Sequence, residues 1–177
     1  NTAGALMIGM ALVGGATVIA ASTQASVAGV VRQEMAADLL LRSADSNVPA
    51  GAIEAVEALP EVASADVMAF AFGQATRPGE EAEPTIILSA EREIFGRSLD
   101  VEVVDGDLDV LGRGEILVNQ RMAADWEVGD TVTLTGATGA VEARVGAIIS
   151  SSALGGGFIV SPEVLDTLEA PQAQLID

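Results

Sequence analysis

The sequence contains neither cysteine nor histidine. Their absence excludes disulfides, thiol nucleophiles, Ser-His-Asp triads, and the usual zinc and haem sites. Tyrosine is also absent, and one tryptophan and four phenylalanines leave little aromatic surface for stacking against a sugar. No GxxxxGK[ST] phosphate-binding motif is present, so nucleotide hydrolysis by that route is excluded. We therefore expect no catalytic residues, no cofactor and no metal site, and we expect that the chain is not an enzyme.

Positive charge is also scarce, since 26 acidic residues face only eight basic ones and the net charge is −18. All eight basic residues are arginines, and they form no cluster. Such a chain repels nucleic-acid phosphates, so we expect no nucleic-acid partner. Every charged residue lies at or beyond Arg32. The sequence thus divides into an uncharged N-terminal part and an acidic remainder, which is long enough for one compact domain or two small lobes.

The uncharged part contains the run ALMIGMALVGGATVIAASTQASV. From Ala3 to Ser22 the residues are uncharged and mostly apolar, and as a helix rising ~1.5 Å per residue they would cross the ~30 Å core of a bilayer. We predict a transmembrane helix with its ends at Ala3 and Ser22. Small residues four positions apart would let a second helix approach closely. These helix-packing residues are Ala11, Gly15, Ala16 and Ala20.

Two alternatives to a transmembrane helix remain. A signal peptide has a basic N-terminal region and a shorter apolar stretch, whereas this sequence starts at Asn1 without a cation. A buried core helix rarely stays apolar on every face for five turns. Beyond Ser22 no proline or strong cap occurs before Ala37, so we predict that the helix continues as a stalk. Such a stalk would transmit motion stiffly into the residues that follow.

The acidic part alternates between strand and helix patterns. Met68, Phe70 and Phe72 fall on one side of a strand at period two. Ser161 is a plausible N-cap of the last helix. The predicted strands are 38–43, a segment within 62–72, 85–90, 115–119, two within 129–149, 158–161 and the start of a last one at 174–177; the predicted helices are 49–59, 120–126 and 161–170.

Three carboxylates at Asp105, Asp107 and Asp109 have a spacing that resembles a calcium-binding loop. An EF-hand requires glycine and glutamate further along, where this chain has Val110 and Ile116. We therefore interpret the acidic segment as a solvated turn.

Other polar segments are best explained structurally. Gly129 and Asp130 predict a turn, because glycine permits positive φ and aspartate can bond the following backbone before the strand TVTL. Ser150, Ser151 and Ser152 have no histidine or lysine to activate them, so we expect a loop. Trp126 ends an apolar helix pattern, and we expect it to pack half-buried between lobes.

Several segments carry a family resemblance through their order along the chain. The span ALMIGMALV leads toward DLLLRSA, and a helix closed by ALPEVASADVM follows. DVEVVDGDLDVLGRGEILVNQRMAADWEVGDTVTL then combines two apolar strands, a DG loop and a GDTV turn, and GGGFIVSPEVLDTL supplies a closing strand and helix. Together they resemble the extracytoplasmic core domain of the FtsX-like, or MacB-type, permeases of ABC transporters.

The resemblance implies an α+β fold with an N-terminal transmembrane and stalk helix followed by a two-lobed domain. The implied boundaries are a helix at 1–36, an α/β porter-like lobe at 37–90 plus 157–177, and an inserted β-rich lobe at 91–156. Members of the family carry this domain between the first two of four transmembrane helices. We therefore expect the sequence to be part of a longer protein of the cell membrane, with the residues after 36 outside the cytoplasm.

The resemblance also implies partners and a function. A separate cytoplasmic ABC ATPase binds ATP, the permease helices move, and the outer domains of two permease copies or homologues rearrange to export a substrate or activate a partner. The lipid bilayer surrounds the spans. Two other hypotheses stay open: a singly membrane-anchored extracellular binding module without an ATPase, and a secreted domain whose apolar run is a signal peptide.

Overall fold

A computed structural model describes residues 7, 10–19, 22, 34–39, 41 and 51–168. The predictions at Ala3, at Ala20 and at the last strand, 174–177, lie outside these residues. In chain order the elements are α2 (Ala52–Glu57), β1 (Ala69–Thr76), β2 (Glu83–Ser89), the 3-10 helix η1 (Arg92–Ile94), β3 (Glu102–Gly106), the 3-10 helix η2 (Leu108–Arg113), β4 (Ile116–Asn119), β5 (Thr131–Thr135), β6 (Ala140–Ser150), β7 (Phe158–Val160) and α3 (Pro162–Leu168).

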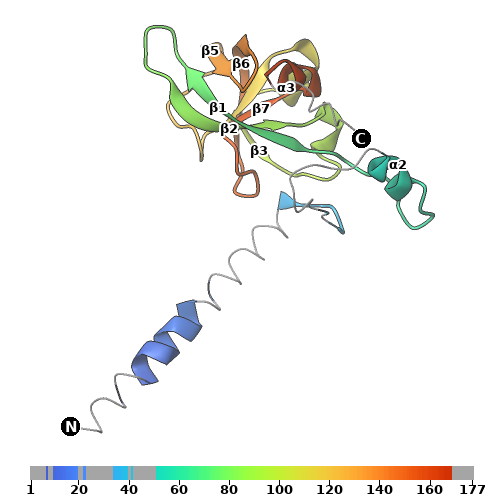
Figure 1. Ribbon diagram of the computed structural model, residues 1–177, viewed down its shortest axis with the longest axis vertical. Helices are drawn as coiled ribbons and strands as arrows, with labels where there is room; N and C mark the ends of the chain where they lie inside the picture. The colour runs from blue at the N-terminus through green and yellow to red at the C-terminus, as the bar shows by residue number, and fades with distance from the viewer. Residues whose placement is uncertain are drawn as a thin grey trace, which may run out of the picture.

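The strands form one sheet in the order β3-β6-β4-β7-β2-β1-β5, and β5 also pairs with β6. Six strands therefore close into a barrel, while β3 lies outside the ring against β6 (Figure 1). The length of β6 makes this possible. Its residues 140–144 pair with β5, residues 145–149 run parallel to β4, and residues 147–150 pair with β3. Closure leaves the ring strands without free edges.

Two hydrophobic clusters stabilise the barrel. The first draws residues from all six ring strands and from α3, and includes Ile87, Leu134, Val145 and Phe158. The second lies beneath η1 and η2 and includes outward-facing residues of β4, β6 and β7. Because inward and outward residues of the central strands are both covered, β4 is buried at every position.

The turn between β5 and β6 holds the end of α3. The backbone N–H and the hydroxyl of Thr138 both donate to the carbonyl oxygen of Leu168, at 3.1 and 3.2 Å. This approach requires a residue without a side chain at Gly136, where a Cβ would lie 2.3 Å from the same oxygen. A carbonyl that the helix itself leaves unpaired is thereby satisfied.

The α+β content is confirmed, and most predicted elements are present with shifted ends. The strand of residues 85–90 is β2, that of 115–119 is β4, and the final described helix is α3. Phe70 and Phe72 share one side of β1, as predicted, but that side is the exposed one. Ala71 and Ala75, on the opposite side, enter the core instead.

Two predicted elements are wrong. Residues 38, 39 and 41 form no strand, and the side chains of Leu39 and Leu41 are exposed, so these leucines do not pack in the core. Residues 120–126 form a single turn in place of a helix. The carbonyl of Asn119 accepts from both Met122 and Ala123, and Asp125 then adopts a φ of 66°, which ends the turn.

The expected separation into two lobes is not seen in the part of the chain that the structure describes. Strand β1 pairs with β5 and strand β4 pairs with β7, and both pairings cross the boundaries expected at residues 90 and 156. The physical reason is that the apolar faces of both segments are buried in one shared core. The segment 91–156 thus supplies half of a common barrel.

The N-terminal part is helical at residues 10–19 and exposed there. Among these residues are Ala11, Gly15 and Ala16, while Ser22 is also helical. Within the described residues, the structure contains no helix of the length and apolarity that crossing a membrane requires. The transmembrane helix stays a prediction. The helix predicted at 1–36 does not reach residue 36: Glu34 is helical, and Met35 leaves helical geometry because it forms a β-bridge with Leu99.

Candidate functional site

Residues 34–36, here called the attachment segment, join the N-terminal part of the chain to the barrel. The backbone N–H of Asp100 donates to the carbonyl of Glu34 at 2.8 Å, and the N–H of Ala36 donates to the carbonyl of Ser98 at 3.0 Å. Between them Met35 forms an isolated β-bridge with Leu99 and packs against the second core cluster. The segment is therefore held by backbone bonds on both sides of an apolar contact.

The carboxylate of Glu34 makes a further connection, to a loop after β6 that we call the serine loop, residues 150–154. The N–H of Ser152 donates to both carboxylate oxygens at 2.9 Å, and the N–H of Ala153 donates to Oε2 at 3.1 Å. The hydroxyl of Ser151 also donates to Oε2. Successive backbone N–H groups that point at one carboxylate form an anion-binding concavity, and Glu34 fills it.

Asn119, at the end of β4, fixes the shape of the serine loop. Its side-chain nitrogen donates to the carbonyls of Ser151 and Leu154 at 3.0 and 3.1 Å. Its side-chain oxygen accepts from the N–H groups of Ser151 and Arg121 at 3.2 and 3.3 Å. Asn119 is fully buried, so these four bonds have no competition from water. The amide thus positions the loop that receives Glu34.

Electrostatics favour the charged form of Glu34. Partial burial raises the pKa of its carboxyl, but the hydrogen bonds from the serine loop and the positive charge of Arg121 outweigh that cost. The net effect holds the pKa of Glu34 below its usual value of 4.5. Arg121 is itself oriented by a bond from Nε to the hydroxyl of Ser150 at 3.1 Å.

This lowered pKa predicts a pH dependence. Glu34 loses a proton more readily in the folded chain than in the unfolded chain. The charged carboxylate therefore contributes fully to the free energy of unfolding above about pH 5, and this contribution is lost as the pH falls through the folded pKa. We expect wild type to exceed Glu34→Gln in unfolding free energy by about 1 kcal/mol near neutral pH, and by less below about pH 4. Denaturant titrations at several pH values measure this difference.

The matched control for this measurement is Glu142→Gln, which removes a charge from an exposed position of β6. Its difference from wild type should not follow the same pH course. A Glu34→Gln difference that stays constant from pH 3 to pH 7 would count against the carboxylate as the source of attachment.

A second ion pair lies beside the attachment segment. Arg97 binds the carboxylate of Asp66 through two nitrogens, with Nε 3.1 Å from Oδ2, and the hydroxyl of Ser98 donates to the same carboxylate. The bonds from Arg97 are the main cause of the lowered pKa of Asp66, and burial opposes them. Since the carbonyl of Ser98 accepts from Ala36, this pair is one residue away from the attachment.

The residues singled out from the sequence lie elsewhere. Gly129 has a φ of 102°, and the carboxylate of Asp130 accepts from the N–H of Glu127 at 3.0 Å, so its bond runs to the preceding backbone and not to the following one. Trp126 is partly buried, packs edge-on against Phe158 with 5.4 Å between ring centroids, and has the guanidinium of Arg77 over its ring at 4.1 Å. These contacts give the tryptophan a packing role.

The acidic segment also has structural uses. Asp107 caps η2 by accepting from the N–H of Asp109 at 2.8 Å, and Asp105 accepts from the N–H of Gly106 at 2.9 Å. Asp109 pairs with Arg92 at 2.5 Å. No group of three or more acidic side chains in the described part of the chain is arranged to hold a metal ion.

Sequence reasoning missed the attachment site. From the sequence, Glu34 is indistinguishable from the other polar residues of the predicted stalk. The hydroxyl of Ser151, which binds it, lies 117 residues further along the chain. One usable signal was present: a polar Asn119 at the end of the apolar run ILV. A buried amide at such a position must have partners.

Comparison with known proteins gives few matches. No family model matches the chain, and no curated protein matches it. Among solved structures, a domain described as belonging to a permease protein from Porphyromonas gingivalis has a TM-score of 0.49 and 16% identity, over 63% of this chain and 52% of that one. This chain therefore spans about half the length of that structure.

A second similar structure is the extracellular domain of the noncanonic ABC-type transporter YknZ from Gram-positive bacteria. Its TM-score is 0.46 and its identity 13%, over 76% of this chain and 74% of that one. Both TM-scores lie below 0.5.

Proposed function

We propose that the chain is the extracytoplasmic domain and first transmembrane helix of an ABC transporter permease subunit. In this proposal a separate cytoplasmic ATPase moves the permease helices, and the barrel carries that motion to export or partner activation outside the membrane. The partners are the ATPase subunit, a second permease copy or homologue, and the lipid bilayer. The protein resides in the cell membrane, with the residues after 36 on the extracytoplasmic side.

The observation that carries this proposal is the attachment of residues 34–36. The side chain of Glu34, the backbone of the segment and the apolar contact of Met35 all join the barrel within three residues. Three kinds of contact in so short a stretch resist displacement better than a flexible linker does. A movement of the N-terminal part would therefore act on the serine loop and on residues 98–100 together. The order of the sequence segments resembles that of the FtsX-like permeases and supports the same proposed function.

Copurification tests the proposal. The full-length protein, tagged and extracted from its native membrane in a mild detergent, is expected to bring an ABC ATPase with it and to show ATP hydrolysis. A matched purification of an unrelated tagged membrane protein supplies the background. Recovery of the full-length protein at high yield with no ATPase subunit and no hydrolysis above background would contradict the proposal.

A singly anchored extracellular binding module is the alternative. The cavity described below favours it, because a binding domain needs a pocket and does not need an ATPase. The same purification separates the two functions: the alternative expects no ATPase subunit.

A further inference from the structure

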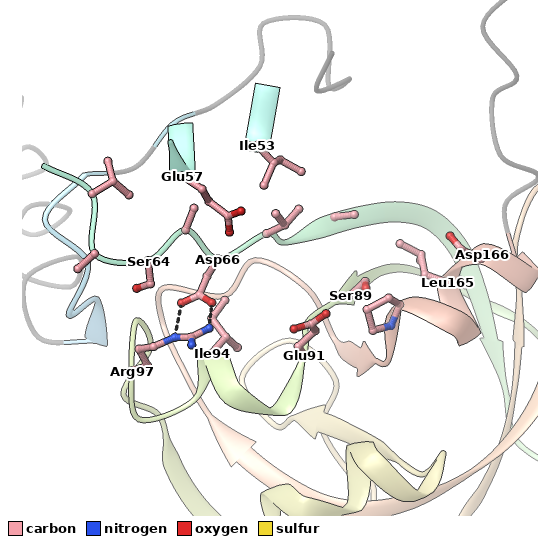
Figure 2. Close-up of a pocket in the computed structure, with 16 residues that line it drawn as sticks. Ile53, Glu57, Ser64, Asp66, Ser89, Glu91, Ile94, Arg97, Leu165 and Asp166 are labelled. Atoms are coloured by element: carbon pink, nitrogen blue, oxygen red, sulfur yellow. Dashed lines mark hydrogen bonds and ion pairs between the residues drawn. The ribbon is translucent and has the colours of Figure 1, made fainter. Parts of the chain in front are cut away.

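A cavity lies beside the attachment segment but does not include it. Its volume is about 660 Å³, which is within the range of small-molecule sites. Figure 2 shows it between α2, the strand that follows Asp66, the turn that carries Arg97, and α3.

Negative charge dominates the wall of this cavity. Asp66 is neutralised by Arg97, and no ion pair or hydrogen bond engages the side chains of Glu57, Glu91 and Asp166 within the described residues. All three are exposed. In Figure 2 the carboxylate of Glu57 lies above the Asp66–Arg97 pair, and that of Glu91 lies to its right. Arg97 is bonded to Asp66 and also attracts Glu91 at longer range. Among the described lining residues this one cation therefore faces four carboxylates, and the wall keeps an excess of negative charge.

Apart from Ser64 and Ser89, the remaining lining is apolar. It comprises Ile53, Val62, Val67, Ile94 and Leu165, together with small residues and a proline. Val67 is 47% exposed, so apolar surface stays in contact with water at the cavity. An occupant that covered this surface would gain from its burial, at roughly 25 cal/mol per Å².

We propose that this cavity binds a cationic amphipathic molecule, with an amine, ammonium or delocalised cation near the three carboxylates and an apolar body against the isoleucine and valine side chains. A neutral apolar occupant would leave the carboxylates facing low-dielectric material, and an anion would be repelled by them. The proposal depends only on the described residues around the cavity. It does not rest on the proposed function.

Fluorescence anisotropy of rhodamine 6G, an aromatic cation, tests the proposal. The full chain is placed in nanodiscs of uncharged phosphatidylcholine, and empty nanodiscs give the background. The carboxylate analogue of the dye keeps the same ring system but is net neutral. We expect the cation to bind at least about tenfold more tightly than the analogue, with the difference shrinking as salt is added.

Matched variants locate the binding site. The triple variant Glu57→Gln, Glu91→Gln, Asp166→Asn should weaken rhodamine 6G binding about tenfold or more. A control triple, Glu81→Gln, Glu83→Gln, Glu142→Gln, changes the net charge equally at exposed positions away from the cavity and should leave binding within about twofold. Val67→Trp, which fills the cavity without changing charge, should abolish binding of both dyes.

The outcomes separate clearly. Equal losses in the two triple variants would show that net charge alone attracts the dye and would overturn the proposal. Equal affinity for cation and neutral analogue would also overturn it, as would undiminished binding by Val67→Trp. Failure of the ATPase copurification described above would leave these dye results standing, because they concern the cavity alone.

Discussion

Replacing Asn119 with leucine is expected to lower the free energy of unfolding by about 3 to 5 kcal/mol. Leucine has nearly the same volume, so the effect isolates the four hydrogen bonds of the amide. Removing the amide leaves the carbonyls of Ser151 and Leu154 and the N–H of Ser151 buried without a hydrogen-bond partner from residue 119. Each stranded group carries its own desolvation cost of about 1 to 3 kcal/mol. Urea denaturation followed by the fluorescence of Trp126 measures the loss.

Gln120→Leu is the matched control for Asn119→Leu, because the neighbouring side chain is exposed. It should change the unfolding free energy by less than about 0.5 kcal/mol. A loss below about 1 kcal/mol in Asn119→Leu would show that the serine loop does not depend on this amide. A further readout is amide exchange at Ser152, which should accelerate in the leucine variant before global unfolding does.

Replacing Glu34 with alanine is expected to release the attachment segment while the barrel stays folded. The amides of Ser152 and Ala153 lose their acceptor, and those of Ala36 and Asp100 lose a neighbour that holds the segment in place. For a partly exposed carboxylate we expect exchange at these amides to accelerate about tenfold, which corresponds to about 1.4 kcal/mol. Hydrogen exchange resolved by residue measures this acceleration.

The consequence for the proposed transporter is larger. In the full-length protein with its ATPase, Glu34→Ala should reduce transport at least tenfold while ATP hydrolysis continues, because the helix moves without pulling the barrel. Glu102→Ala, which removes an exposed carboxylate from β3, is the control and should behave as wild type. Normal transport by Glu34→Ala, with its exchange accelerated, would mean that motion reaches the outer domain by another route.

Local patterns in the sequence predict the strands well. Polar and apolar residues alternate in TVTL, which lies in β5. The segment VEARVGAII begins with alternation, ends in a continuous apolar run, and lies in β6. A period-two pattern does not say which side is buried, however. The two aromatic residues of β1 are the exposed ones, while Ala71 and Ala75 face the core, where Phe158 of β7 supplies the aromatic side chain. Burial is decided by the partner strands, which local periodicity does not contain.

Long-range pairing explains the other differences. Nothing in the segment 91–156 shows that its strands complete a ring with β1 and β7, because that closure depends on pairings between distant residues. The attachment site has the same origin. The sequence around Asn119 indicates a buried amide but not its partners, and Glu34 and the serine loop carry no local signal of their contact, which exists only where the fold brings them together. The turn at Gly129 could be predicted from the sequence, because a positive φ depends on the local backbone and not on distant residues.

The Arg97–Ser98 dipeptide belongs to two features at once. Its side chains hold Asp66 in the wall of the cavity, while the carbonyl of Ser98 accepts from the attachment segment. Where a change at one of two such features alters the other, the coupling free energy is the same in both directions. If an occupant of the cavity tightens the attachment by some factor, a load that loosens the attachment must weaken the occupant by that factor. Tension on the N-terminal part would then serve as the signal for release.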